Sequence, residues 1–159
     1  MYKSQIFKLI ASLALPLGLG AIAGLFTAQA VPEWYVTLNR PSFNPPNWLF
    51  GPVWTTLYLI MGISLFLIWK QSASKERNVA IFAFLLQQIL NFAWSFIFFY
   101  FNMIGLALIE IILLWISIVI MLVLFYKIKP IAAYINIPYL LWVTFATVLN
   151  ASYYFLNRS

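Results

Sequence analysis

The sequence has no cysteine, no histidine and few acidic residues. Without cysteine and histidine the chain cannot form a disulfide, a Cys/His zinc site, or a Ser-His-Asp or Cys-His catalytic group. Its only carboxylate side chains are Glu33, Glu76 and Glu110, which lie far apart in the sequence. We therefore expect no metal site, no required cofactor and no conventional hydrolytic chemistry.

Charge of either sign is scarce as well. Charged residues make up 8% of the 159 positions and hydrophobic residues 65%, whereas a soluble domain is about 25% charged and about half apolar. This composition indicates that hydrocarbon, and not water, surrounds most of the chain. The formal net charge of +6 does not indicate a nucleic-acid-binding protein, because the basic residues form no stripe and lie between apolar runs.

Long apolar runs dominate the sequence. A helix needs about 20 apolar residues to cross a bilayer, and five segments reach that length, at about 6–26, 48–69, 79–101, 104–126 and 131–156. We predict an all-α integral membrane protein whose single domain, residues 1–159, is a bundle of five transmembrane helices. The first segment is too long for the apolar core of a signal peptide, so we expect it to be retained. The long first loop, 27–47, contains four prolines and is predicted not to be helical.

Lysine and arginine predict the orientation, because positively charged short loops stay in the cytoplasm. With five spans, the N-terminus and the second and fourth loops share one side of the membrane. That side holds seven of the nine basic residues, and the other side holds only Arg40 and Arg158. We predict a protein of the bacterial cell membrane with a cytoplasmic N-terminus and an external first loop.

Tryptophan and tyrosine are abundant, with seven and nine copies. Most lie near the ends of the predicted helices, as in the aromatic belts of membrane proteins, but four tryptophans lie deeper, namely Trp54, Trp94, Trp115 and Trp142. Helical spacing places three of these on a shared face with other residues. The resulting stripes are Trp54, Tyr58 and Met61; Gln87, Gln88, Asn91, Trp94 and Ser95; and Trp142, Ala146 and Asn150.

The three stripes are predicted to face the bundle interior, because amides that face lipid are costly. Two interpretations then remain open. The stripes could line a cavity for a flat, largely apolar ligand, whose rings stack on indoles while amides orient its edges. Alternatively, interhelical hydrogen bonds and aromatic packing could fill the interior completely, and spacing alone slightly favours this second interpretation.

Two smaller features lie within the spans. Glu110 is the only acid inside a predicted span, which makes it a functional-site candidate by default. The alternative, which we favour, is a neutral carboxyl group hydrogen-bonded to a neighbouring helix. Gly20 and Gly24 form a G-x-x-x-G pattern, which predicts a close helix–helix contact.

A more specific pattern begins in the first loop. It reads Trp34-Tyr35-x-x-Leu38-x-Arg40-Pro41-x-Phe43-x-Pro45-Pro46 and continues as Phe50-Gly51-Pro52-Val53-Trp54-Thr55. Two further stretches, 90–95 and 138–150, agree with it in order and spacing. Over nearly the whole chain the sequence resembles the translocator protein family, also called the tryptophan-rich sensory protein (TspO/MBR) or peripheral-type benzodiazepine receptor family.

The resemblance implies a five-helix bundle in membrane lipid and, because members are commonly dimeric, a homodimer. Members bind porphyrins, notably protoporphyrin IX, and synthetic isoquinoline carboxamide and benzodiazepine ligands, and animal members also bind cholesterol. The implied pocket lies between the helices and beneath the first loop. Matching positions are Trp34, Trp54, Tyr58, Asn91, Trp94, Trp142 and Ala146, to which helical spacing adds Asn150.

The resemblance also implies a photochemical activity, because some bacterial members are reported to degrade protoporphyrin in light. The matching tryptophans are Trp54 and Trp142. An excited porphyrin can generate reactive oxygen or oxidise a nearby indole, so this chemistry needs no acid–base group. Porphyrin would then be ligand or substrate, and whether the protein counts as an enzyme is left open. The alternative function is transport of porphyrins or cholesterol-like lipids across the membrane.

Overall fold

The computed structural model describes residues 2–158, and every regular element in that range is helical. Five spans within it are long and apolar enough to cross a membrane. The predicted all-α membrane bundle is thus confirmed. In chain order the elements are α1 (Tyr2–Glu33), the short 3-10 turn η1 (Tyr35–Thr37), α2 (Asn47–Trp69), α3 (Lys75–Ser95), the π-helical turn η2 (Phe96–Tyr100), α4 (Ile104–Ile128), α5 (Pro130–Tyr134) and α6 (Ile137–Asn157).

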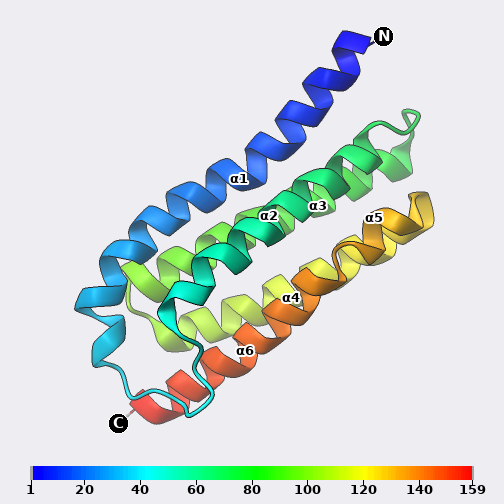
Figure 1. The fold of residues 1–159 in the computed structure, drawn as a ribbon. Helices are drawn as coiled ribbons and strands as arrows, with labels where there is room; N and C mark the ends of the chain where they lie inside the picture. Colours follow the sequence, from blue (N-terminus) through cyan, green and yellow to red (C-terminus); the bar gives the residue numbers. More distant parts are fainter. Residues whose placement is uncertain (1, 159) are drawn as a thin grey trace.

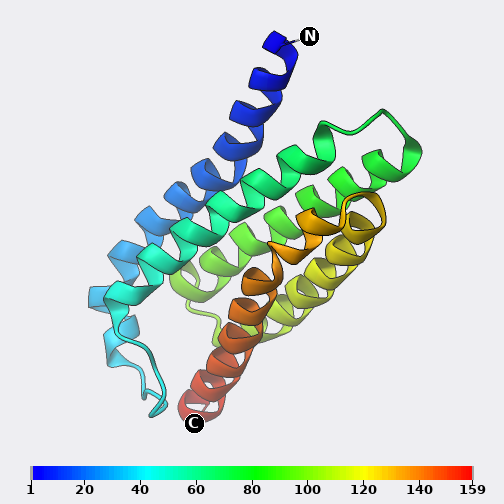
Figure 2. The ribbon, with the colours of Figure 1, turned by 45° about the vertical axis from the view of Figure 1, so that its right-hand side comes forward.

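The helices run lengthwise beside one another, and the two chain termini lie at opposite ends of the bundle (Figure 1). The connections after α2 and α4 lie at the end that holds the N-terminus, whereas those after α1 and η2 lie near the C-terminus (Figures 1 and 2). Helix α1 packs mainly on α2, α3 on α4, and α4 on α6. The beginning of α1 projects away from the other helices (Figure 2), so α1 is attached chiefly through α2.

Helix α1 is longer than the sequence predicted. It runs to Glu33 and includes Pro32, so the prediction of a non-helical loop is wrong over residues 27–33. A proline removes only one backbone donor from a helix. The helical hydrogen bonds resume beyond Pro32, where the Trp34 N–H donates to the Ala30 carbonyl at 2.9 Å. The connection to α2 is therefore η1 followed by the segment 38–46, which ends at Pro46 directly before α2.

The fifth span is not the single helix that the predicted segment 131–156 implied. It breaks between α5 and α6, because Pro138 at the start of α6 has no N–H to continue the ladder. The Ser64 hydroxyl and the Asn136 amide donate to the Ala132 carbonyl at this break, at 2.7 and 2.9 Å. Irregular backbone at membrane depth is tolerated where it is buried in protein, and Asn136 is fully buried.

The bundle interior contains two apolar clusters. The larger one joins α2, α3, α4, α5 and α6 and includes Met61 and Phe84, both fully buried. The smaller one lies beside the first loop and includes Phe98 and Tyr153. Trp94 packs against both clusters. The end of the bundle near the first loop therefore has a separate aromatic core.

Large apolar side chains also cover the outer faces of the helices. Phe82 and Leu141, for example, are 67% and 63% exposed, as expected for a surface in contact with lipid tails. Trp115 lies on this surface too, and its indole N–H donates to the Thr144 hydroxyl at 2.8 Å. Trp115 therefore faces lipid and links α4 to α6 through this hydrogen bond. It does not line the cavity described below.

Candidate ligand-binding cavity

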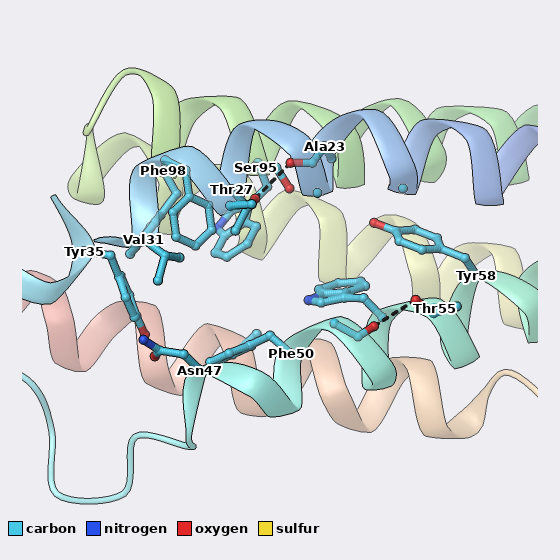
Figure 3. A pocket seen from close by; sticks show the side chains of 18 of the residues that line it. Ala23, Thr27, Val31, Tyr35, Asn47, Phe50, Thr55, Tyr58, Ser95 and Phe98 are labelled. Atoms are coloured by element: carbon cyan, nitrogen blue, oxygen red, sulfur yellow. Dashed lines mark hydrogen bonds between the residues drawn. The ribbon is translucent and has the colours of Figure 1, made fainter. Parts of the chain in front are cut away.

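A cavity of about 630 Å³ lies between α1, α2, α3, η2 and α6, in the half of the bundle nearest the first loop (Figure 3). Pockets for small organic ligands typically measure about 300–1,000 Å³. No residue that lines this cavity carries a formal charge. Parts of the three predicted stripes therefore line a space, and the interpretation that packing fills the interior completely is wrong, although Met61, Gln87 and Gln88 are packed and do not line the cavity. Six of the predicted residues line it, namely Trp54, Tyr58, Trp94, Trp142, Ala146 and Asn150.

Two indoles meet at a right angle in the wall formed by α2 and α6. The ring centroids of Trp54 and Trp142 are 6.5 Å apart, and their planes are inclined at 89°. Trp54 also stacks on Tyr58 at 5.5 Å and 25°, and Phe50 packs edge-on against Trp142 at 6.0 Å. Because Phe50, Trp54 and Tyr58 are spaced four residues apart, α2 presents one continuous aromatic face to the cavity.

The opposite wall, from α3 and η2, is held by hydrogen bonds within the bundle. The Trp94 indole N–H donates to the Asn150 side-chain oxygen at 3.0 Å, and the Asn150 amide donates to the Ile104 carbonyl at 3.0 Å. The Trp94 ring stacks on Phe98 with centroids 5.3 Å apart. This wall therefore offers ring faces to a ligand, while the polar atoms of Asn150 are already paired.

The indole N–H of Trp142 is different. It is buried and has no hydrogen-bond partner among the described residues, whereas the indoles of Trp94 and Trp115 both donate. A buried donor without a partner costs about 1–3 kcal/mol. Because the nitrogen is not accessible from the cavity, an acceptor atom on a ligand would recover that free energy only after the side chains around Trp142 shift.

Two of the predicted site residues lie outside the lining. Asn91 is 2% exposed, accepts from the Tyr58 hydroxyl at 2.8 Å and donates to the Tyr139 hydroxyl at 3.0 Å. It therefore orients Tyr58 from behind the wall and does not face the cavity itself. Trp34 is also absent from the lining, where its neighbour Tyr35 takes its place.

Helix α1 supplies a wall of small residues that sequence reasoning did not assign to the site. Its members include Gly20, Ala23, Gly24 and Thr27. The G-x-x-x-G spacing was a signal, but it was interpreted only as a helix-packing motif. Gly20 does serve that purpose, because a Cβ there would collide with the Tyr58 ring, whereas a Cβ at Gly24 would meet nothing within 4 Å. Small side chains on α1 opposite aromatic ones on α2 thus create the space.

The first loop is fastened to α6 beside the cavity. The Asn39 N–H donates to the Asn157 side-chain oxygen at 2.9 Å, and the Asn157 amide returns a bond to the Asn39 carbonyl at 3.0 Å. The Asn44 side-chain oxygen accepts from the Tyr35 and Tyr153 hydroxyls, both at 2.9 Å. Burial raises the pKa of Tyr35 above its ordinary value of 10.0, so this hydroxyl remains a donor at neutral pH.

Comparison with known proteins shows the family of the chain. The model of the TspO/MBR family matches residues 12–156. The chain belongs to the TspO/MBR family. It is 40% identical over 153 residues to the tryptophan-rich protein TspO of Archaeoglobus fulgidus, a match that covers 96% of this chain and 99% of that protein. It is 39% identical over 120 residues to the translocator protein of Homo sapiens, covering 74% and 71% of the two chains, and 31% identical over 118 residues to the tryptophan-rich sensory protein of Cereibacter sphaeroides, covering 74% and 73%.

Membership of the TspO/MBR family gives the chain a membrane function of the TspO type. The matched region 12–156 contains every residue that lines the cavity, from Leu17 on α1 to Tyr153 on α6. All walls of the candidate site therefore lie within the part of the chain that defines the family.

Glu110 lies apart from this site. It is 6% exposed on α4 and does not line the cavity. Neither of its carboxyl oxygens has a hydrogen-bond partner among the described residues, so the prediction of a bond to a neighbouring helix is wrong. Gln88 is buried with both amide atoms unpaired as well. The TspO/MBR bundle thus keeps unpaired polar atoms that the cavity does not use.

Proposed function

We propose that this TspO/MBR-family protein binds porphyrins and related flat aromatic molecules in the cavity. The observation that carries the proposal is the right-angled pair of Trp54 and Trp142 in the cavity wall, because it offers two aromatic rings to one planar ligand. The uncharged lining and the volume of about 630 Å³ favour a largely apolar ring system over a charged metabolite.

Light-dependent degradation of protoporphyrin is the finer part of the proposal. Trp54 and Trp142 would both lie beside a ring held between them. An excited porphyrin either passes its energy to dioxygen, whose two oxygen atoms then add across a bridging carbon–carbon bond, or takes one electron from an indole to leave a radical pair. The protein contributes confinement, orientation and an oxidisable side chain.

The test is a titration of the purified protein with protoporphyrin IX, followed by tryptophan fluorescence first in the dark and then under illumination. We expect saturable quenching in the dark, and loss of porphyrin absorbance only with both light and protein. Trp54→Phe and Trp142→Phe should slow degradation far more than they weaken binding, whereas Trp115→Phe on the lipid face should match the wild type. Absence of dark quenching would refute binding, and equal degradation in all variants would refute the role of the indoles.

Transport of porphyrins or cholesterol-like lipids is a second candidate function, favoured by the name of the human relative, translocator protein. Sealed vesicles that contain the protein should then accumulate porphyrin faster than protein-free vesicles, and only along a gradient. Equal uptake by the two kinds of vesicle would exclude transport and leave binding with or without photochemistry.

The proposed location is the cell membrane, with the N-terminus in the cytoplasm because most basic residues lie at that end. Ser42 and Ser72 are both exposed, one in the first loop and one between α2 and α3. The chain has no cysteine, so Ser42→Cys and Ser72→Cys each create a single thiol. A membrane-impermeant thiol reagent added to intact cells should label Ser42→Cys only, and labelling of Ser72→Cys alone would reverse the orientation.

A further inference from the structure

We propose that ligands enter the cavity from the hydrocarbon layer, through a slot between the second half of α1 and the first half of α2. This inference rests on the proposed binding function and deepens it, because it names the source of the ligand. The molecules bound would be those already dissolved in the bilayer, and not those that approach from water past the first loop.

From Lys8 to Gly20, α1 lies in close contact with α2. Lys8 Nζ donates to the Trp69 carbonyl at 3.3 Å. Further along, a Cβ on Gly62 would lie 2.8 Å from the Ser12 carbonyl oxygen, so the two backbones touch there. Gly20 then closes on the Tyr58 ring. These contacts leave no path between α1 and α2 from Lys8 to Gly20, on the side of the cavity toward the beginning of α1.

Beyond Gly20, small residues lie on both helices at one edge of the cavity, beside the aromatic face of α2. The same antiparallel register brings Gly24 level with Thr55, and Ala28 level with Gly51. All four residues line the cavity and are exposed. A Cβ added at either glycine would meet nothing within 4 Å. Figure 3 shows the cavity between these two helices, with α1 above and α2 below. The cavity is not fully enclosed, and we place its opening at these small, exposed residues.

The other side of α1 is closed. Phe26 packs against Phe96 and Tyr100 of η2, with ring centroids 4.7 and 5.9 Å apart. At the end of the bundle, the pair of hydrogen bonds between Asn39 and Asn157 fastens the first loop. Entry between α1 and η2 would have to separate stacked rings, and entry from water would have to release the loop.

The slot lies at hydrocarbon depth and is apolar. Gly24 precedes the end of α1 at Glu33 by nine residues, which is roughly 14 Å along a helix, and half of the hydrocarbon core is about 15 Å. The hydroxyl groups of Thr27 and Thr55 donate to their own helices, to the Ala23 and Gly51 carbonyls at 3.0 and 2.9 Å (Figure 3). The threonines therefore need no polar partner from a passing molecule.

The test uses the full chain in lipid vesicles that already contain protoporphyrin IX, with tryptophan quenching as the signal. Gly24→Phe and Gly51→Phe place a ring in the slot from either helix. We expect both association and dissociation to slow about tenfold, which corresponds to about 1.4 kcal/mol of added barrier. A simple loss of affinity would instead speed dissociation. Leu25→Phe is the matched control, because Leu25 is 68% exposed and does not line the cavity.

Release of the loop tests the competing route. Asn157→Ala removes its bonds to Asn39 and should leave both rates unchanged if entry is lateral. Unchanged rates in both glycine variants, or faster entry in Asn157→Ala, would overturn the proposal.

A second measurement needs no porphyrin. In the ligand-free protein, lipids brominated near mid-chain should quench the fluorescence of Trp54 through the slot. The difference in quenching between wild type and Trp54→Phe gives the contribution of that indole. This quenching should fall in Gly24→Phe and not in Leu25→Phe. If that difference is present and protoporphyrin does not bind, the slot stands and the proposed function fails. If all variants are quenched equally, the slot is refuted.

Discussion

Replacement of Gly62 by alanine tests whether the seam between α1 and α2 fixes the bundle. The new Cβ would lie 2.8 Å from the Ser12 carbonyl oxygen and 2.9 Å from the Leu13 Cα. Both are backbone atoms of α1, which cannot rotate aside as a side chain can, so the helix must move. Overpacking of this kind costs about 1–3 kcal/mol, while alanine gains up to about 1 kcal/mol over glycine inside a helix. We therefore expect Gly62→Ala to destabilise the protein by up to about 2 kcal/mol.

Gly51→Ala is the matched control, because it makes the same chemical change on the same helix where a Cβ would meet nothing within 4 Å. It should be neutral or slightly stabilising. The difference between the two variants isolates the packing cost, about 1–3 kcal/mol. Unfolding in mixed micelles with a rising fraction of sodium dodecyl sulfate, followed by circular dichroism, measures it. Equal stability of the two variants would refute the inference that the backbones of α1 and α2 touch at Gly62.

Hydrogen bonds around the cavity have measurable consequences of their own. Tyr58→Phe leaves the buried Asn91 oxygen without its 2.8 Å donor and should cost about 1–3 kcal/mol in the same unfolding assay; no change would mean that Asn91 finds another donor. Asn157→Ala removes two bonds to Asn39 and should speed proteolysis within the first loop, whereas equal cleavage would show that the tyrosine contacts suffice. Because burial raises the pKa of Tyr35 above its ordinary 10.0, the unfolded state loses this proton first. Stability should therefore fall as pH rises above about 10, and less so in Tyr35→Phe.

Much of the fold could be predicted because hydrocarbon offers the backbone no hydrogen-bond partners. A span must be long and apolar, so hydropathy alone locates five of them. The misplaced boundaries share one cause. Proline was interpreted as a helix end at Pro32 and was not interpreted as a break at Pro138. What a proline does depends on partners from elsewhere, such as Ser64 on α2, which satisfies the carbonyl at the α5–α6 break.

The site could be predicted in part, for a similar reason. Amides are costly in lipid, so the helical spacing of the amides indicates the inward faces of α3 and α6, and the spacing of Trp54 and Tyr58 indicates that of α2. The small residues of α1 carry no such signal, because glycine suits both a tight contact and an open wall. Only the residue opposite decides between them, and it is Tyr58 at Gly20 and empty space at Gly24. Asn91 was wrongly placed in the lining, because a polar residue on an inward face can instead lie behind the wall and hydrogen-bond to a residue that lines the cavity, here Tyr58.

The rigidity of the aromatic walls explains why the cavity stays open and which ligand it suits. Trp94 is hydrogen-bonded to Asn150 and Tyr58 to Asn91, so these rings are held in the walls and cannot turn to fill the cavity. The walls of an empty cavity forgo dispersion contacts. A ligand that only fills the space recovers those contacts. A ligand that also shifts the side chains around Trp142, so that it accepts from the buried, unpaired N–H, recovers a hydrogen bond of about 1 kcal/mol, or about fivefold in Kd. Trp142→Phe should therefore weaken dark binding of protoporphyrin by about that factor, and Trp115→Phe should not. If the two variants bind equally well, the ligand is held by its ring faces alone.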